Sequence, residues 1–199
     1  MIKAIIFDYG GVVATTDYSV IEWAISQCKH KEKAEQVMNE LLVPFEKGKI
    51  TNIHFWNEFS RKTGLELPKD YRNLWINSYR IKSIQDKSML NLIKRLKARG
   101  YKTILLSNTI EPNASFNRKN GCYSLFNPVI LSCSVGLMKP DKRIYSLALD
   151  KAGLKASECI FVDDTPRNIF PAREIGMFPI HFRNSVQLEE DLKSMGLKF

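Results

Sequence analysis

The 199-residue sequence lacks several features that would mark other classes of protein. It contains no low-complexity segment and no internal repeat. No apolar run approaches the roughly 20 residues needed to span a bilayer, so we expect no membrane partner. Cysteine and histidine are scarce, with four and three residues, and no two cysteines form a CxxC pair. We therefore expect free thiols and no zinc site.

Acidic residues are outnumbered by basic ones, 21 to 30, which gives a formal net charge of +9. Such a balance suits an anionic substrate, and it also suits nucleic acid. The lysines are spread over expected helical faces, and no nucleic-acid-binding motif is present. A nucleic-acid role would rest on charge alone, so we expect no nucleic-acid partner and favour a small anionic substrate.

The amino-terminal segment MIKAIIFDYGG does not resemble a cleavable signal peptide, because Asp8 interrupts its apolar stretch. We therefore expect a cytoplasmic protein. No sustained heptad repeat indicates a coiled-coil assembly, and the sequence leaves the oligomeric state undetermined.

Most of the chain alternates between short apolar runs and amphipathic segments. Strands are expected at 2–7, 102–107, 128–132, 158–164 and 178–182, and helices at 89–100, 111–120, 141–152, 166–175 and 186–195. Strand followed by helix, repeated, predicts a parallel sheet with helices on both faces. The expected fold class is α/β, a Rossmann-like three-layer α/β/α domain.

The segment between the first expected strand and the remaining strands has a different spacing of apolar residues. From Tyr18 to Tyr79, large apolar residues recur at helical spacing, and we expect three or four helices and no strand. The predicted organisation is a core domain of residues 1–16 and 83–199, with residues 17–82 forming an inserted helical domain. The insertion follows the first strand, so it is expected to stand over the edge where the strands end.

Four polar segments end predicted strands or follow them closely. They are Asp8-Tyr9-Gly10-Gly11, Ser107-Asn108-Thr109, Lys139-Pro140, and Asp163-Asp164 with Asn168. Right-handed crossovers bring the carboxyl ends of parallel strands to one edge, where such sheets bind ligands. Carboxylates suit Mg²⁺, and a lysine with hydroxyl and amide donors suits phosphate. Two adjacent carboxylates after a buried strand are also costly without a cation, which favours a metal.

These segments, in this order, resemble the four motifs of the haloacid dehalogenase (HAD) superfamily. The stretches LMKPDKRIY and FVDDTPRNIFPAREIGM are especially similar to its lysine and acidic segments. The helical insertion resembles the small cap domain of the family, and FEKGKITNIHFW resembles caps in a branch of sugar-phosphate phosphatases that includes glucose-1-phosphatase-like enzymes. The resemblance implies a HAD-like core with a helical cap inserted after the first strand.

The resemblance also implies a Mg²⁺-dependent phosphatase acting on small phosphomonoesters, with sugar phosphates expected. Asp8 would attack phosphorus and form an aspartyl-phosphate, which water then hydrolyses. Ser107 and Asn108 would bind phosphoryl oxygens, and Lys139 would neutralise the charge shared by Asp8 and the phosphate. The segment Ser107-Asn108-Thr109 is also typical of a helix N-cap, and both roles are compatible.

Mg²⁺ would be held, by the same resemblance, at the carboxylates that follow the first and fourth strands of the sheet. Asp8, the Gly10 carbonyl and Asp164 match direct ligands of the family. Asp163 matches an acid that reaches the metal through water. Asn168 lies one helical turn beyond Asp164 and could orient a water molecule on the metal.

One position departs from the family pattern. The family places a second Asp two residues after the nucleophile as general acid and base, and this sequence has Gly10 there. A proton donor to the leaving oxygen typically contributes about 10²–10⁴-fold in rate. The alternative to an active enzyme is therefore a catalytically weak or inactive binding or regulatory protein. Asp17 is either a substitute donor or, as its position favours, a helix cap before the insertion.

Other branches of the superfamily fit less well. Its dehalogenases lack the Mg²⁺-binding acids, so Asp163 and Asp164 favour phosphate chemistry. Within the cap, the candidate substrate-reading residues are Glu46, Lys47, His54 and Trp56. For Trp56 the competing interpretation is a place in the apolar core of the cap.

Overall fold

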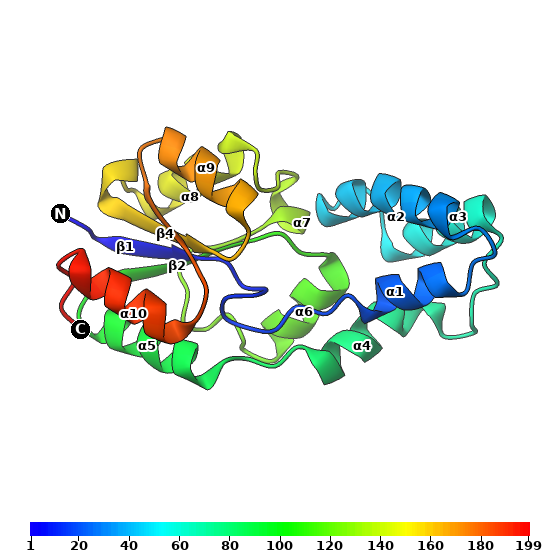
Figure 1. The fold of residues 1–199 in the computed structure, drawn as a ribbon, viewed down its shortest axis with the longest axis horizontal. Helices are drawn as coiled ribbons and strands as arrows, with labels where there is room; N and C mark the ends of the chain where they lie inside the picture. The colour runs from blue at the N-terminus through cyan, green and yellow to red at the C-terminus, as the bar shows by residue number, and fades with distance from the viewer.

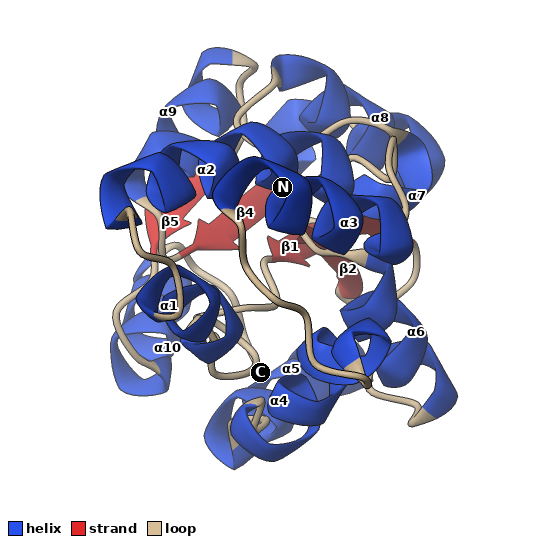
Figure 2. Cartoon of the chain, turned by 90° about the vertical axis from the view of Figure 1, so that its right-hand side faces the viewer, coloured by secondary structure: helices blue, strands red, loops and turns tan.

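In the computed structural model, which describes all 199 residues, a five-stranded parallel sheet lies between two layers of helices (Figures 1 and 2). The strands are β1 (Ala4–Phe7), β2 (Lys102–Ser107), β3 (Val129–Leu131), β4 (Cys159–Asp163) and β5 (Phe178–His181). Their spatial order is β3-β2-β1-β4-β5, and each neighbouring pair is parallel. The predicted α/β fold is confirmed.

The two faces of the sheet are covered by different helices, as Figure 2 shows. One layer contains α5 (Lys87–Ala98) and α10 (Ser185–Ser194), and the other contains α8 (Lys142–Ala152) and α9 (Pro166–Glu174). Successive strand residues point to opposite faces. Ile5 and Phe7 of β1 accordingly join the apolar cluster of the first layer, and Ala4 and Ile6 join that of the second. Both faces of β1 are buried, which explains its uninterrupted apolar run.

The helices of the core begin at or within two residues of their predicted starts, but one expected cap is absent. Asp86 caps α5 by accepting a 2.7 Å hydrogen bond from the Ser88 amide, and Asp141 caps α8. The expectation that Ser107-Asn108-Thr109 caps the following helix is wrong. Helix α6 (Glu111–Lys119) has Ile110 at its N-cap, with no side-chain cap. The three polar side chains are used in tertiary contacts instead.

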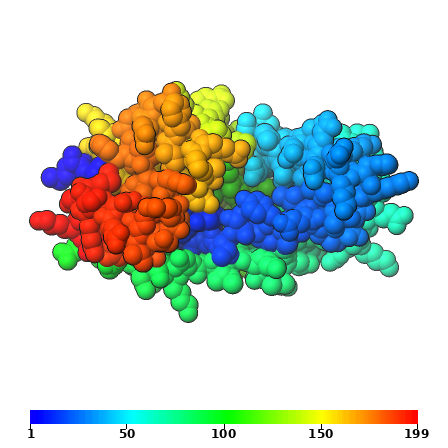
Figure 3. All heavy atoms as spheres, viewed as in Figure 1, coloured from blue at the N-terminus to red at the C-terminus, as the bar shows by residue number.

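Residues 17–82, which we call the cap, contain only helices, as predicted. They are α1 (Ser19–Ser26), α2 (Lys31–Glu46), α3 (Asn52–Thr63), the short 3₁₀ helix η1 (Tyr71–Asn73) and α4 (Leu74–Lys82). A cluster of aromatic side chains from α2, α3 and α4 fills the cap interior. Trp56 is 0% exposed within it, so its side chain packs the cap core. Figure 3 shows the cap as a blue and cyan lobe beside the core.

The cap meets the core at several places, one of which is the packing of α4 on α6, where Asn117 Nδ2 donates to the Tyr79 hydroxyl at 2.6 Å. The connecting segments run side by side, with Thr15 Oγ1 donating to the Lys82 carbonyl at 2.6 Å and the Ile84 amide donating back to Thr15 at 2.9 Å. Beyond the end of α2, Gly48 lies directly on the Cys133 carbonyl of the short helix α7 (Ser132–Val135). The end of α2 is therefore fixed against the core.

The remaining short element, η2 (Ala156–Glu158), leads into β4. All four cysteines are free thiols, as expected. No helix of the structure combines the length and the apolarity required for a membrane span.

Candidate active site

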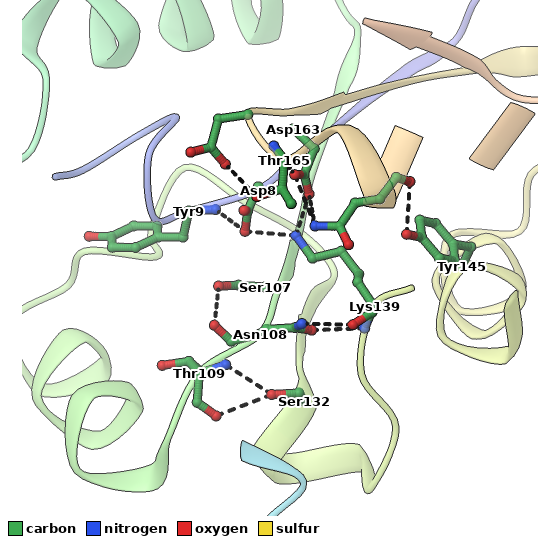
Figure 4. A network of polar contacts seen from close by, with 12 residues as sticks. Asp8, Tyr9, Ser107, Asn108, Thr109, Ser132, Lys139, Tyr145, Asp163 and Thr165 are labelled. Carbon is green, nitrogen blue, oxygen red and sulfur yellow. Dashed lines mark hydrogen bonds and ion pairs between the residues drawn. The ribbon is translucent and has the colours of Figure 1, made fainter. Parts of the chain in front are cut away.

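A cavity of about 220 Å³ lies between the cap and the edge of the sheet at which β1, β2 and β4 end. All four polar segments named in the sequence reach this region, although they come from distant parts of the chain (Figure 4). The predicted residues that line the cavity are Asp8, Gly10, Ser107, Asn108, Lys139, Asp164 and Asn168. Asp163 lies behind the wall of the cavity, in contact with two of them.

Asp8 is the first residue after β1, and its amide still continues the sheet by donating to the Val162 carbonyl at 2.9 Å. Its side chain is 12% exposed. The Tyr9 amide donates to Asp8 Oδ1 at 2.7 Å, and Lys139 Nζ lies 2.9 Å from the same oxygen. Burial raises the pKa of Asp8 to about 6, against the opposing effect of the lysine. One carboxylate oxygen is thus fixed, and the other is free.

Lys139 is a buried cation, 1% exposed, that bridges two carboxylates. Its Nζ lies 2.6 Å from Asp163 Oδ2 as well as 2.9 Å from Asp8 Oδ1. Burial opposes the charge, but Asp8 and Asp163 outweigh it and raise the pKa of Lys139. The lysine is therefore charged at neutral pH and holds the Asp8 carboxylate in a fixed position.

The Asn108 side chain holds the backbone of Lys139 in place. Asn108 Nδ2 donates to the Lys139 carbonyl and the Lys139 amide donates to Asn108 Oδ1, both at 2.9 Å (Figure 4). Thr109, the next residue, donates its amide to Ser132 Oγ at 2.9 Å. These contacts explain why the segment does not cap α6. They also commit the Asn108 side chain to the Lys139 backbone, while the Asn108 backbone amide can make the expected phosphate contact.

Asp163 is completely buried, and protein groups occupy both of its carboxylate oxygens. Lys139 contacts Oδ2, the Thr165 amide donates to Oδ1 at 2.8 Å, and Asn168 Nδ2 donates to both at 3.0 and 3.1 Å. The Asn168 carbonyl in turn accepts from the Tyr145 hydroxyl at 2.9 Å. Asp163 and Asn168 therefore form the support of Lys139. Asn168 Oδ1 is buried and has no hydrogen-bond partner.

Asp164 directs its carboxylate toward the loop that follows Asp8. A ligand oxygen from each of Asp8, Asp163 and Asp164 lies within 4.8 Å of the others. Burial, followed by the charge of Asp163, raises the pKa of Asp164. Gly11 has φ +78°, and a Cβ at this position would overlap Asp164 Oδ2 and lie 2.5 Å from its Cγ. The second glycine of the loop is therefore required by both backbone conformation and space.

Ser107 and Gly10 complete the floor of the cavity. Ser107 Oγ has only a long 3.4 Å hydrogen bond to the Asn108 carbonyl, so its hydroxyl can donate to a ligand. Gly10 has no side chain, and the atom nearest to a methyl group at this position would be Thr16 Oγ1, at 3.4 Å. Space for a carboxylate therefore exists at position 10, but this chain does not place one there.

The structure brings only one of the four expected cap residues into the cavity. Glu46, the last residue of α2, lines it, whereas Lys47 and His54 do not and Trp56 is buried in the cap core. Asp17 lines the cavity, but its carboxylate is hydrogen-bonded to residues of α1 and α4. It accepts from the Ser19 amide at 3.0 Å and from the Ser19 and Ser78 hydroxyls at 2.6 Å each.

Sequence reasoning missed several residues that line the cavity, among them Thr16, Tyr18 and Arg167. Arg167 occupies the first turn of α9, directly after the two acids, and its position there was the available signal. No local pattern distinguishes Thr16 or Tyr18, because their place depends on how the cap folds back.

The sequence of the cap and of most of the core matches a known family. The family model of haloacid dehalogenase-like hydrolases matches residues 2–176, and the chain belongs to this family. The expected superfamily membership is therefore confirmed, and with it the class of protein, a hydrolase.

Two relatives match this chain over nearly their whole length. Sesquiterpene phosphatase astK of Aspergillus oryzae is 27% identical over 197 residues, covering 97% of this chain and 96% of the relative. D-ribitol-5-phosphate phosphatase of Bacteroides thetaiotaomicron is 26% identical over 212 residues, covering 96% and 97%. A crystal structure of a HAD family enzyme from B. thetaiotaomicron shares the fold, with a TM-score of 0.80 and 22% identity over 99% of both chains.

Proposed function

We propose that this protein is a Mg²⁺-dependent phosphatase that hydrolyses small-molecule phosphomonoesters through an aspartyl-phosphate on Asp8. The observation that carries the proposal is the fixed Asp8 carboxylate, 2.9 Å from the buried Lys139 and at the floor of a cavity. Relatives named as phosphatases, matched from end to end, support it.

The residues of the site divide the reaction between them. Asp8 uses its free carboxylate oxygen to attack phosphorus, and the leaving oxygen departs toward the cap. Lys139, held by Asp163 and Asn108, neutralises the negative charge that Asp8 and the phosphoryl group bring together. The Ser107 hydroxyl and the Asn108 backbone amide donate to phosphoryl oxygens. Water then hydrolyses the aspartyl-phosphate and regenerates Asp8.

The donor set at the end of β1 and β4 fits Mg²⁺. Mg²⁺ binds oxygen, often through one or two carboxylates and the phosphate of the substrate. Asp8, Asp164 and the Gly10 carbonyl would be the protein ligands, and the carboxylates of this cluster lie within 4.8 Å of one another. Asp163 would act through water, because protein donors already occupy its oxygens. Bound Mg²⁺ would supply positive charge at the phosphoryl oxygens.

The cavity sets a limit on the substrate. Its volume of about 220 Å³ is below the range of about 300–1,000 Å³ typical of sites for drug-sized ligands. Phosphorylated sugars and sugar alcohols fit this size, and D-ribitol-5-phosphate phosphatase is a relative over 97% of its own length. We therefore propose a small sugar or polyol phosphate as the substrate.

Gly10 favours a second candidate function, a family member that binds phosphate esters with little or no turnover. Gly10 has an ordinary φ, and the space beside it admits a side chain. A Gly10→Asp variant can therefore be made without a backbone clash. Turnover that appears only in this variant would support the second candidate.

The test is phosphate release from a panel of sugar, polyol, nucleotide and cofactor phosphates, with Mg²⁺ and with EDTA. Asp8→Asn should abolish Mg²⁺-dependent release. Asp70→Asn is the matched control, because Asp70 is exposed and its side chain has no partner. Full activity in purified Asp8→Asn protein would refute the proposal.

A further inference from the structure

The proposed reaction lacks a proton donor where the sequence has Gly10. An alkoxide is a poor leaving group, and a positioned acid typically contributes about 10²–10⁴-fold to its departure. The group nearest to the empty position is the Thr16 hydroxyl, 3.4 Å from a Cβ built on Gly10. A hydroxyl is too weak an acid to supply the proton near neutral pH. The proton donor must therefore be another residue that lines the cavity.

Four carboxyl groups line the cavity, those of Asp8, Asp17, Glu46 and Asp164. Asp8 is the nucleophile and Asp164 a proposed metal ligand. Asp17 is partly buried, but hydrogen bonds from Ser19 and Ser78 outweigh the effect of burial and lower its pKa. An ionised, hydrogen-bonded carboxylate cannot donate a proton. Asp17 therefore joins the start of α1 to α4, and Glu46 is the one carboxyl group of the four that remains.

Glu46 has the environment that a proton donor requires. It is the last residue of α2, where the partial negative charge of the helix end disfavours a carboxylate. It has no ion pair or hydrogen bond. Burial raises its pKa, although Arg167 and Lys139 lower it, and Tyr18 lines the same cavity. An acid with a raised pKa is matched to proton transfer near neutral pH.

The position of Glu46 is fixed rather than incidental. Two residues further along the chain, Gly48 rests on the Cys133 carbonyl and holds the end of α2 against the core. The cap thus presents one unpaired carboxyl group across the cavity from Asp8 and Lys139. With phosphorus placed at Asp8, the phosphoryl group would lie on the core side of the cavity and the leaving group of the ester would face the cap.

We propose that Glu46, delivered by the cap, is the catalytic acid and base that replaces the Asp missing at position 10. This inference rests on the proposed function. As Asp8 forms its bond to phosphorus, the bond to the leaving oxygen breaks and the Glu46 proton passes to that oxygen, giving the alcohol. The Glu46 carboxylate then takes a proton from water as the water oxygen attacks the aspartyl-phosphate. Inorganic phosphate, the Asp8 carboxylate and protonated Glu46 result.

The test compares two substrates that differ in their need for an acid. The nitrophenolate of p-nitrophenyl phosphate leaves without a proton, whereas the alkoxide of glycerol 3-phosphate needs one. The ratio kcat/KM reports the steps up to departure of the leaving group, so hydrolysis of the aspartyl-phosphate does not mask the effect. Glu46→Gln should lower kcat/KM for glycerol 3-phosphate by about 10²–10⁴-fold and change it only a few-fold for p-nitrophenyl phosphate.

The matched control is Asp17→Asn, the same change of carboxylate to amide in another residue that lines the cavity. It should leave the ratio between the two substrates as in the wild type. Gly10→Asp combined with Glu46→Gln should recover much of the alkyl-ester rate, which a structural role of Glu46 would not allow. An equal loss for both substrates in Glu46→Gln, or no loss, would overturn the proposal.

A second measurement requires no variant. The wild-type kcat/KM for glycerol 3-phosphate should fall as the pH rises and Glu46 loses its proton, while kcat/KM for p-nitrophenyl phosphate should not follow it. Parallel pH profiles would contradict the assignment. Failure of the Glu46 proposal can be distinguished from failure of the proposed function, because Asp8→Asn should abolish hydrolysis of both esters regardless of the role of Glu46. A wild type that hydrolyses neither ester contradicts both proposals.

Discussion

Gly11→Ala tests the arrangement of Asp164 without changing any polar group. At φ +78° an alanine incurs a backbone cost of about 1–2 kcal/mol. Its Cβ would also overlap Asp164 Oδ2 and lie 2.5 Å from Cγ, a separation that Cβ atoms do not tolerate. The Asp164 carboxylate must therefore move away from the loop and from Asp8.

The two effects can be separated by a control glycine. Gly136 has φ +73°, and nothing lies within 4 Å of a Cβ placed there, so Gly136→Ala has the backbone cost without the overlap. For a chain of this size, about 1–2 kcal/mol corresponds to a Tm lower by about 2–8 °C. Both variants should show at least this loss in a thermal melt.

Only Gly11→Ala should alter catalysis. Disturbing groups that orient metal ligands typically costs about 10–100-fold in metal affinity or activity, and moving a ligand itself should reach at least that range. The assay is phosphate release as a function of Mg²⁺ concentration. Gly11→Ala should require at least about 10-fold more Mg²⁺ than Gly136→Ala. Identical Mg²⁺ dependence in the two variants would refute the placement of Asp164 at the metal.

Two further predictions concern the buried lysine and the cap contact. Lys139→Met leaves two buried carboxylates without their cation, so it should abolish activity and lower the free energy of unfolding by about 3–5 kcal/mol at pH 7, measured with urea. That deficit should shrink as the pH falls through the raised pKa of Asp8 and its carboxylate becomes protonated; unchanged stability at pH 7 would contradict the bridge. Gly48→Ala should lower kcat/KM, because its Cβ would overlap the Cys133 carbonyl and displace the end of α2. Gly100→Ala, with φ +87° and open space around it, should not; equal effects of the two would show that the contact is unimportant.

The framework of the fold was predictable because its signals are local and repeated. The apolar run from residue 2 ends at Asp8, and β1 ends one residue earlier, at Phe7. The strand predicted at 102–107 matches β2 residue for residue. In parallel sheets these strands are buried on both faces, so continuous apolar runs and intervening amphipathic helices carry the information. Convergence of the polar segments then follows from topology alone.

The use of each polar side chain was less predictable. An asparagine at position 108 suits either a phosphate contact or a helix cap. Its side chain instead forms a pair of hydrogen bonds with the Lys139 backbone, 31 residues away. Trp56 lies at the surface or in the core according to which face of α3 is covered, and the cap folds that face inward. The place of Glu46 in the cavity depends on the contact between the cap and the core. These contacts depend on the tertiary structure, and no local pattern in a single sequence predicts them.

The most direct test of the central claim is to trap the covalent form of Asp8. Wild-type protein mixed with a ³²P-labelled ester and Mg²⁺, then quenched in acid within one turnover, should carry label on the peptide that contains Asp8. The label should be absent with EDTA and absent from Asp8→Asn. Phosphate release from the wild type with no label on this peptide, or with label on another residue, would contradict the account.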